Sequence, residues 1–199
     1  LWAEYIPTAD KLTMASQSAR AQQIVNSFMR LGQMLQRHQI PFALVDHELL
    51  ADAQLKGQNS LQVAGNSYRC LLVPAGVELP ETATAITNRA SERVIQDGDA
   101  AMAINVDKVR EATGPLYHLT TASPRIAMGQ FERDGRDILL LVNVGKEPYN
   151  ASMVAPQPQK WLRLDPHNSA VTPLSLNAQG EVPLQLEPHQ ACLLIGGSD

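Results

Sequence analysis

The first regular pattern in this sequence is a run of apolar residues at helical spacing. Apolar side chains recur every three or four positions, which places them on one face of a helix. The residues between them are rich in Gln, Arg and Met, which have good helix propensity. The earliest N-terminal cap for this helix is Thr8–Ala9–Asp10, and the helix must end before Pro41, whose ring disfavours helical geometry in the preceding residue. The apolar positions are Ala21, Ile24, Val25, Phe28, Leu31 and Leu35.

Between Pro41 and residue 115 the pattern alternates between strand-like and helix-like segments. Phe42–Val45 is fully apolar, as a buried parallel strand is, and Asp46 suits the N-cap of a short helix through Leu49 and Leu50. This alternation predicts a mostly parallel, helix-covered sheet in an α/β domain over residues 1–115. The other predicted segments are a strand at Ser60–Val63, a turn at Gly65–Asn66, a central strand at Tyr68–Val73, a helix from Pro80 through Ala90, a strand at Ala100–Ile104 and a helix at Val106–Ala112.

After Gly114–Pro115 short β-type runs follow one another. Asp134–Gly135 gives the strongest hairpin signal in the chain, because Gly accepts the positive φ that a primed turn requires. Val182–Leu186 alternates apolar and polar residues and contains Pro183, so we expect it at a sheet edge. Residues 116–199 are therefore predicted to form a small antiparallel β-sandwich. Its remaining strands are expected at Ile126–Glu132, Arg136–Val142, Ala151–Val154, Trp161–Leu164, Val171–Leu176 and Ala191–Ile195.

Composition and charge narrow the classes of partner. The chain has 199 residues, of which 44% are hydrophobic, and a formal net charge of -4. Its Lys and Arg residues are scattered, so no basic stripe suits nucleic acid, and no apolar run approaches the roughly 20 residues of a membrane-spanning helix. Leu1–Glu4 lacks the features of a signal peptide. Cys70 and Cys192 each lie in an apolar run, which favours two free core thiols over a disulfide and fits a reducing, cytoplasmic compartment.

Several phrases of the sequence together resemble a known protein region. A truncated Leu1–Trp2 strand end is followed by the long helix, then by IPFALVD with ELL, and then by LQVAGNSYRCLLVP. Later, DGRDILLLVN ends a strand in Asn143, WLRLDP begins another, and LEPHQACLL forms the final strand. This order resembles the C-terminal accessory region of bacterial glycoside hydrolases of the α-L-rhamnosidase and β-galactosidase type.

The resemblance implies a flavodoxin-like or class I amidotransferase-like α/β domain followed by a small β-sandwich. It also implies that this chain is the back part of a larger hydrolase. The catalytic carboxylates of such a hydrolase belong to a barrel of about 250 residues, for which this chain has no room. The catalytic barrel of the same parent chain is then the expected partner, and oligomerisation stays open.

No group of residues meets the requirements of a catalytic, cofactor-binding or metal site, so all three are expected to be absent. A thiol hydrolase needs its Cys on a Gly-flanked turn beside a His, whereas Cys70 lies within a run and His47–Glu48 begins a helix elsewhere. Asp97–Gly98–Asp99 lacks the further oxygen ligands of a calcium loop. The other acidic candidates fit caps, turns or solvated faces, and the histidines lack the paired spacing of a zinc site. These residues are Asp46, Glu48 and Asp165, and His38, His47, His118, His167 and His189.

Two functions follow from these observations. The first is a non-catalytic structural or interface module of a larger carbohydrate-active glycoside hydrolase. The alternative is a carbohydrate-binding module in which exposed aromatic rings of the β domain stack on sugars. Its candidate sugar contacts are Tyr117, Tyr149 and Trp161. Trp161 begins a strand with Leu162 and Leu164, which favours core packing for this ring.

Overall fold

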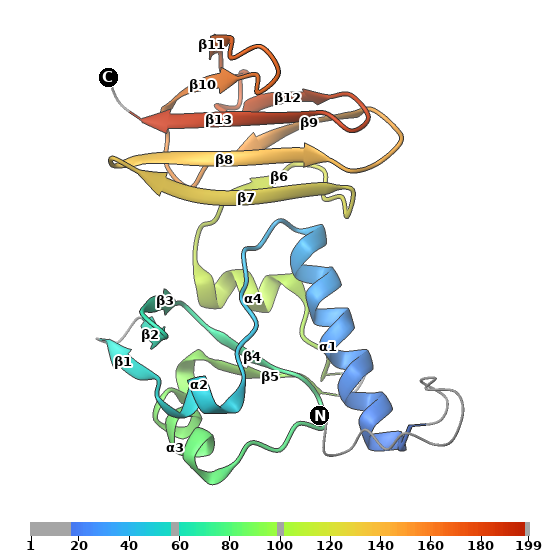
Figure 1. Cartoon of the computed structure of the whole chain (residues 1–199), viewed down its shortest axis with the longest axis vertical. Coiled ribbons are helices and arrows are strands. Elements are labelled where there is room, and N and C mark those ends of the chain that lie inside the picture. Colours follow the sequence, from blue (N-terminus) through green and yellow to red (C-terminus); the bar gives the residue numbers. More distant parts are fainter. Residues whose placement is uncertain (1–16, 57–59, 99–101, 198–199) are drawn as a thin grey trace. The chain divides into compact units, whose positions relative to one another are not determined.

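The computed structural model describes residues 17–56, 60–98 and 102–197, and the chain divides into two compact units. Unit 1 contains the described residues up to Gly32 together with Ala43–Gly114. Unit 2 contains Gln33–Phe42 and the residues from Pro115 onward. Most strands in both units pair antiparallel (Figure 1). The predicted cap at Thr8–Ala9–Asp10 and the strand end at Leu1–Trp2 lie outside the described residues.

The α-helices of the described part are α1 (Ala19–Arg37), α2 (His47–Ala51), α3 (Glu81–Arg89) and α4 (Val106–Thr113). Their local sequence explains where they begin. The Asp46 carboxylate accepts a hydrogen bond from the Leu49 N–H at 2.8 Å, which confirms it as the N-cap of α2. Asn105 caps α4 in the same way, accepting from the Lys108 N–H at 3.0 Å. None of the described helices combines the length and the apolarity needed to cross a membrane.

Unit 1 has two small sheets. Leu61 and Val63 point from the first of them into a core that also contains Ala83 and Ile86 of α3. In the first sheet β2 lies between β1 and β3 in an antiparallel meander, and the second sheet is the parallel pair β4 and β5. The strands are β1 (Gln54–Lys56), β2 (Ser60–Val63), β3 (Asn66–Tyr68), β4 (Leu71–Val73) and β5 (Val94–Gln96), and a 3-10 turn at Ser91–Arg93 precedes β5.

The predicted flavodoxin-like or amidotransferase-like parallel sheet is wrong, and the chain has a mostly β fold. Phe42–Val45 forms no strand, and Leu44 is 69% exposed, because no neighbouring strand covers this run in the described structure. The predicted central strand at Tyr68–Val73 is interrupted after Tyr68, so its two parts belong to different sheets. No strand includes residues 102–104, whereas β5 lies earlier than predicted. A short apolar run therefore did not identify a buried parallel strand.

The strands of unit 2 form two antiparallel sheets. Sheet order is β11-β10-β13-β8-β7 in the larger sheet and β12-β9-β6 in the smaller one (Figure 1). All the β segments predicted after residue 115 are present within a few residues of their expected bounds. The strands are β6 (His118–Leu119), β7 (Ile126–Arg133), β8 (Arg136–Asn143), β9 (Tyr149–Val154), β10 (Lys160–Leu164), β11 (Val171–Leu174), β12 (Val182–Leu186) and β13 (Ala191–Gly197).

Turn chemistry and patterning set the register of unit 2. Asp134 and Gly135 both have positive φ, 53° and 71°, as the two central residues of a type I′ turn require, and they join β7 to β8 as predicted. Pro183 lies in β12, which is an edge strand with one buried face, and this confirms a second expectation. Leu139 and Leu194 are fully buried in the core that the two sheets share.

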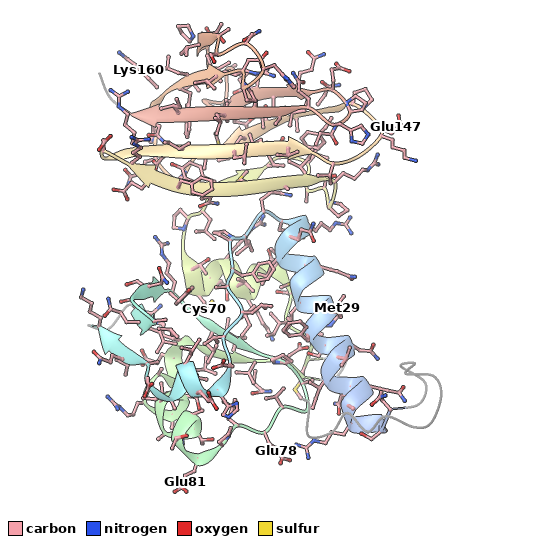
Figure 2. The ribbon with its side chains drawn as sticks, viewed as in Figure 1. Met29, Cys70, Glu78, Glu81, Glu147 and Lys160 are labelled. Atoms are coloured by element: carbon pink, nitrogen blue, oxygen red, sulfur yellow. The ribbon has the colours of Figure 1, made fainter. Side chains whose placement is uncertain are left out.

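Asn143, at the end of β8, is a buried polar side chain that holds two loops of unit 2. Its Nδ2 donates towards the backbone carbonyls of Glu147 at 2.8 Å and of Leu186 and Glu187, both at 3.2 Å. Its Oδ1 accepts from the Gly145 N–H at 3.0 Å. These bonds join the β8–β9 loop, where Glu147 lies (Figure 2), to the end of β12. Asn143 therefore replaces backbone pairing where the strands stop.

Gln39 lies just after the end of α1 and has a left-handed backbone conformation, which glycine usually adopts at this position. Its φ is 55°, and the Ile40 N–H donates to the Leu35 carbonyl in the Schellman pattern at 2.9 Å. The Gln39 side chain is buried, and its Nε2 donates towards the carbonyls of Ser123 at 2.9 Å and Ile126 at 3.3 Å. These bonds join the residues that follow α1 to the segment around the start of β7, all of them within unit 2.

Replacing Asn143 tests this account of unit 2. We expect Asn143→Ala to lower the free energy of unfolding by about 3 kcal/mol, because it leaves several buried backbone groups without a partner. Denaturant unfolding followed by circular dichroism measures the change. Asn168→Ala is the matched control, since Asn168 is exposed and accepts one bond, from the Ala170 N–H. Equal losses in the two variants would contradict a special role for Asn143.

Candidate functional site

The most concentrated polar group of unit 1 lies where the parallel strands β4 and β5 end. Asp97 directly follows β5, and its backbone N–H donates to the Val73 carbonyl at the end of β4 at 2.8 Å. Ser27 and Arg30, one turn apart on α1, both donate hydrogen bonds to Asp97 Oδ2. The Asp97 side chain has no exposed surface, and its Oδ1 accepts from the Ile104 N–H at 2.9 Å.

Two further bonds complete this cluster of Ser27, Arg30 and Asp97, which we call the Asp97 cluster. Ser27 Oγ accepts from the Ala75 N–H at 2.8 Å, and Arg30 Nη1 donates to the Ile104 carbonyl at 3.1 Å. The cluster thus ties α1 to the segments that follow both parallel strands. Each polar atom of the carboxylate has a partner, as stable burial of a charge requires.

Charge and hydrogen bonding together keep the Asp97 carboxylate ionised. Burial alone raises the pKa of Asp97, but the hydrogen bonds from Arg30, Ser27 and the Ile104 N–H outweigh it and hold the pKa below its ordinary value of 3.8. A catalytic general acid needs the opposite shift. The Asp97 cluster is therefore suited to fixing the positions of helix and loops, and unsuited to donating a proton.

Unit 2 contains a second polar group, at the start of β8. Tyr117 Oη donates to Asp137 Oδ2 at 2.5 Å, and Gln159 Nε2 donates to the same two oxygens at 2.9 Å and 3.2 Å respectively. Burial raises the pKa of Tyr117, and the hydrogen bond to Asp137 and the negative charge of Asp137 raise it further. The Tyr117 hydroxyl therefore stays protonated. The Tyr117 ring packs edge-on against Trp161, with ring centroids 5.9 Å apart.

The three aromatic residues predicted to contact sugar all belong to the core of unit 2. Their exposed fractions are 8% for Tyr117, 9% for Tyr149 and 2% for Trp161. The Tyr149 hydroxyl donates to the Thr121 carbonyl, and burial raises its pKa to about 12. Stacking on a sugar needs an open ring face, so these rings do not form a binding platform in this structure.

The cysteines and histidines do not assemble a reactive or metal-binding site in the described residues. Cys70 and Cys192 are both free thiols, as predicted. Cys192 is buried, whereas Cys70, just before β4 (Figure 2), is half-buried instead of fully enclosed. Burial raises the pKa of both thiols, which disfavours the reactive thiolate. No three metal-ligating side chains come together in the part of the chain that the structure describes.

The remaining acidic candidates are placed separately. Asp46 caps α2, Glu48 lies exposed in its first turn, and Asp165 accepts from the His167 N–H at 2.8 Å in a turn. Asp99 lies outside the described residues. Sequence reasoning considered Asp97 as a ligand of a calcium loop or as part of a turn, and so missed the Asp97 cluster. The signal was present in Ser27, a polar residue on the apolar face of α1, with Ile24 and Leu31 on either side.

Replacing Asp97 tests the charge balance of this cluster. At neutral pH we expect Asp97→Asn to lower the free energy of unfolding by about 2 kcal/mol, because it leaves Arg30 without its counter-charge. The folded pKa lies below 3.8, so the stabilisation is fully present above that pH and is lost as the pH falls through the folded value. The gap between wild type and variant should therefore narrow in acid.

Denaturant unfolding over a pH series measures this gap. Asp107→Asn is the control, because the Asp107–Arg110 ion pair is 4.0 Å long and exposed, and its loss should cost less than about 0.5 kcal/mol. A gap that stays constant into acid would contradict the assignment of the charge to Asp97.

Comparison with known proteins finds structures that share this fold but assigns the chain to no family. No protein-family model and no curated protein sequence matches the chain. Among solved structures, the rhamnosidase from Novosphingobium sp. PP1Y matches 76% of this chain with a TM-score of 0.59 and 13% sequence identity. The apo exo-carrageenase GH42 from Bacteroides ovatus matches 87% of it with a TM-score of 0.57 and 12% identity.

The matched region is a small share of each of these enzymes. The chain covers 19% of the rhamnosidase and 27% of the exo-carrageenase. At such low identity the likeness establishes the fold alone. The fold of this chain is thus shared with regions of two larger glycoside hydrolases.

Proposed function

We propose that this chain is a non-catalytic structural or interface module of a larger carbohydrate-active glycoside hydrolase. The observation that carries the proposal is the fold match, which extends over most of this chain and only 19% and 27% of the two hydrolases. Most of each of these two enzymes therefore lies outside the region that this chain matches. The catalytic barrel of the same parent chain is the partner that this proposal names.

Two hydrogen-bonded carboxylates, the buried Asp97 and the partly buried Asp137, support a non-catalytic role. Glycoside hydrolysis uses a pair of carboxyl groups about 5 to 9.5 Å apart, one of them with a raised pKa. Asp97 and Asp137 belong to different units, and each is engaged by its own neighbours. The Asp97 pKa is lowered instead of raised. Asp97 therefore does not offer the acid that this reaction needs.

The same contacts support a role in packing and positioning. The Asp97 cluster, Asn143 and Gln39 each join segments far apart in the sequence through buried hydrogen bonds. Such networks make the position of each segment well defined. The two free thiols favour a reducing compartment such as the cytoplasm. Sugar binding through Tyr117, Tyr149 and Trp161 gains no support from their burial.

Hydrolysis by the purified chain is the first test. We expect no release of nitrophenol from aryl α-L-rhamnosides or aryl β-galactosides above the buffer rate, because the buried carboxylate of Asp97 has a lowered pKa and is held by its own neighbours. Asp97→Asn and Asp137→Asn provide the controls. Turnover that survives purification and disappears in either variant would overturn the non-catalytic assignment.

Sugar titration separates the module from a carbohydrate-binding protein. We expect L-rhamnose and galactose to produce no saturable change in Trp161 fluorescence, because this ring is 2% exposed. The titration uses the Trp2→Phe variant, which leaves Trp161 as the single tryptophan. Saturable quenching would favour the binding function, and its loss in Tyr149→Phe would locate the sugar beside the core.

A further inference from the structure

The described strands of unit 2 form two open sheets with four edge strands, and three of these are short or contain proline. β11 contains Pro173 and β12 contains Pro183, and proline cannot donate to a neighbouring strand. β6 has two residues, His118 and Leu119. Proline and short length are two of the means by which edge strands avoid pairing with other chains. The fourth edge is β7, which has eight residues and no proline.

The backbone groups on the outer side of β7 follow from its pairing with β8. The two-residue turn at Asp134–Gly135 makes Arg133 and Arg136 a hydrogen-bonded pair, and bonding pairs alternate from there. The N–H and C=O groups of Met128, Gln130 and Glu132 therefore point away from β8. No hydrogen bond joins these groups to any residue that the structure describes.

Ile126 also points outward, but its groups are already occupied. The Ile126 N–H donates to the Ser123 carbonyl at 3.3 Å, and its C=O accepts from Gln39 Nε2 at the same distance. Gln39 thus closes the beginning of the β7 edge. The open part of the edge runs from Met128 to Glu132.

We propose that β7 pairs antiparallel with β7 of a second copy of this chain, about a two-fold axis at Gln130. In this register Gln130 faces Gln130 of the partner, and Met128 faces Glu132 of the partner. Each open backbone group then finds a partner, and the groups of Ile126 are not needed. The two five-stranded sheets would become one continuous sheet. This inference does not depend on the proposed function.

Charge argues for this register over its neighbour. Moving the axis to Gly129 would set Arg125 opposite Arg133 of the partner and would require the occupied groups of Ile126. Like charges directly opposite each other are destabilising. With the axis at Gln130, Arg133 faces Ala127 of the partner instead, and no like charges lie opposite each other between positions 127 and 133.

Exposed apolar surface favours the same pairing. Phe131 is 58% exposed, and its ring lies over Gly129 of its own strand, where an added Cβ would come within 2.9 Å of it. In the proposed register Phe131 also faces Gly129 of the partner. Aromatic side chains across from glycine cover bare backbone in sheets. The pairing would therefore bury two Phe131 rings against two glycines.

A charge-swap experiment tests both the dimer and its register. We expect the wild-type chain to reach twice its mass of 21.7 kDa in sedimentation equilibrium as its concentration rises. Q130K and Q130E should each weaken self-association at least about tenfold, because two like charges then meet on the axis. An equimolar mixture of Q130K and Q130E should restore the dimer, as Lys then faces Glu.

Controls separate this effect from a loss of folding. Q185K and Q185E carry the same changes on β12, the edge that Pro183 protects, and should associate as wild type does. Recovery in the mixture also shows that both position-130 variants are folded. A wild type that stays monomeric throughout the series, or a mixture no more dimeric than either variant alone, would overturn the proposal.

Discussion

The structure depends on one constraint, which is that polar groups removed from water need partners. Antiparallel pairing supplies most of these partners. At the ends of the strands the pairing stops, and the backbone groups of the adjoining helices and loops need other partners. Three side chains take over at these places: Asp97 in unit 1, and Asn143 and Gln39 in unit 2. Asn143 and Gln39 bind backbone carbonyls of distant segments, and Asp97 binds the nearby Ile104 N–H together with two side chains of α1. Leaving such groups unpaired would cost about 1–3 kcal/mol apiece, a large share of the net stability of a domain.

The same constraint explains why polar clusters here are poor candidates for catalysis. A catalytic carboxylate must be free to gain or release a proton, whereas Asp97 is held by a cation and two further donors. Tyr117, Asp137 and Gln159 likewise satisfy one another. The polar side chains of these two groups thus bind one another, whereas other groups that could interact lie on the surface. The open β7 edge is one of them.

Local signals in the sequence predicted much of the secondary structure. The N-cap at Asp46, the Asp134–Gly135 turn and the edge strand containing Pro183 depend on neighbouring residues alone, and all three are present. Sheet membership could not be predicted in the same way, because it depends on which distant strands pair. Phe42–Val45 has the composition of a buried strand, yet its first three residues lie exposed and Val45 is only partly buried. The Asp97 cluster was missed for the same reason, since Ser27 and Asp97 are 70 positions apart.

The position of β13 affects the order in which unit 2 can fold during synthesis. This strand is the last one described, yet it lies in the middle of the larger sheet, between β10 and β8. β10 and β11 join β7 and β8 only through it. During synthesis the hairpin of β7 and β8 can form early, but the sheet cannot close until residues 191–197 have left the ribosome. Until then Leu139 and Leu141 lack a neighbouring strand on that side. A chaperone would cover this exposed apolar surface, and rapid completion of translation would shorten the time for which it is exposed.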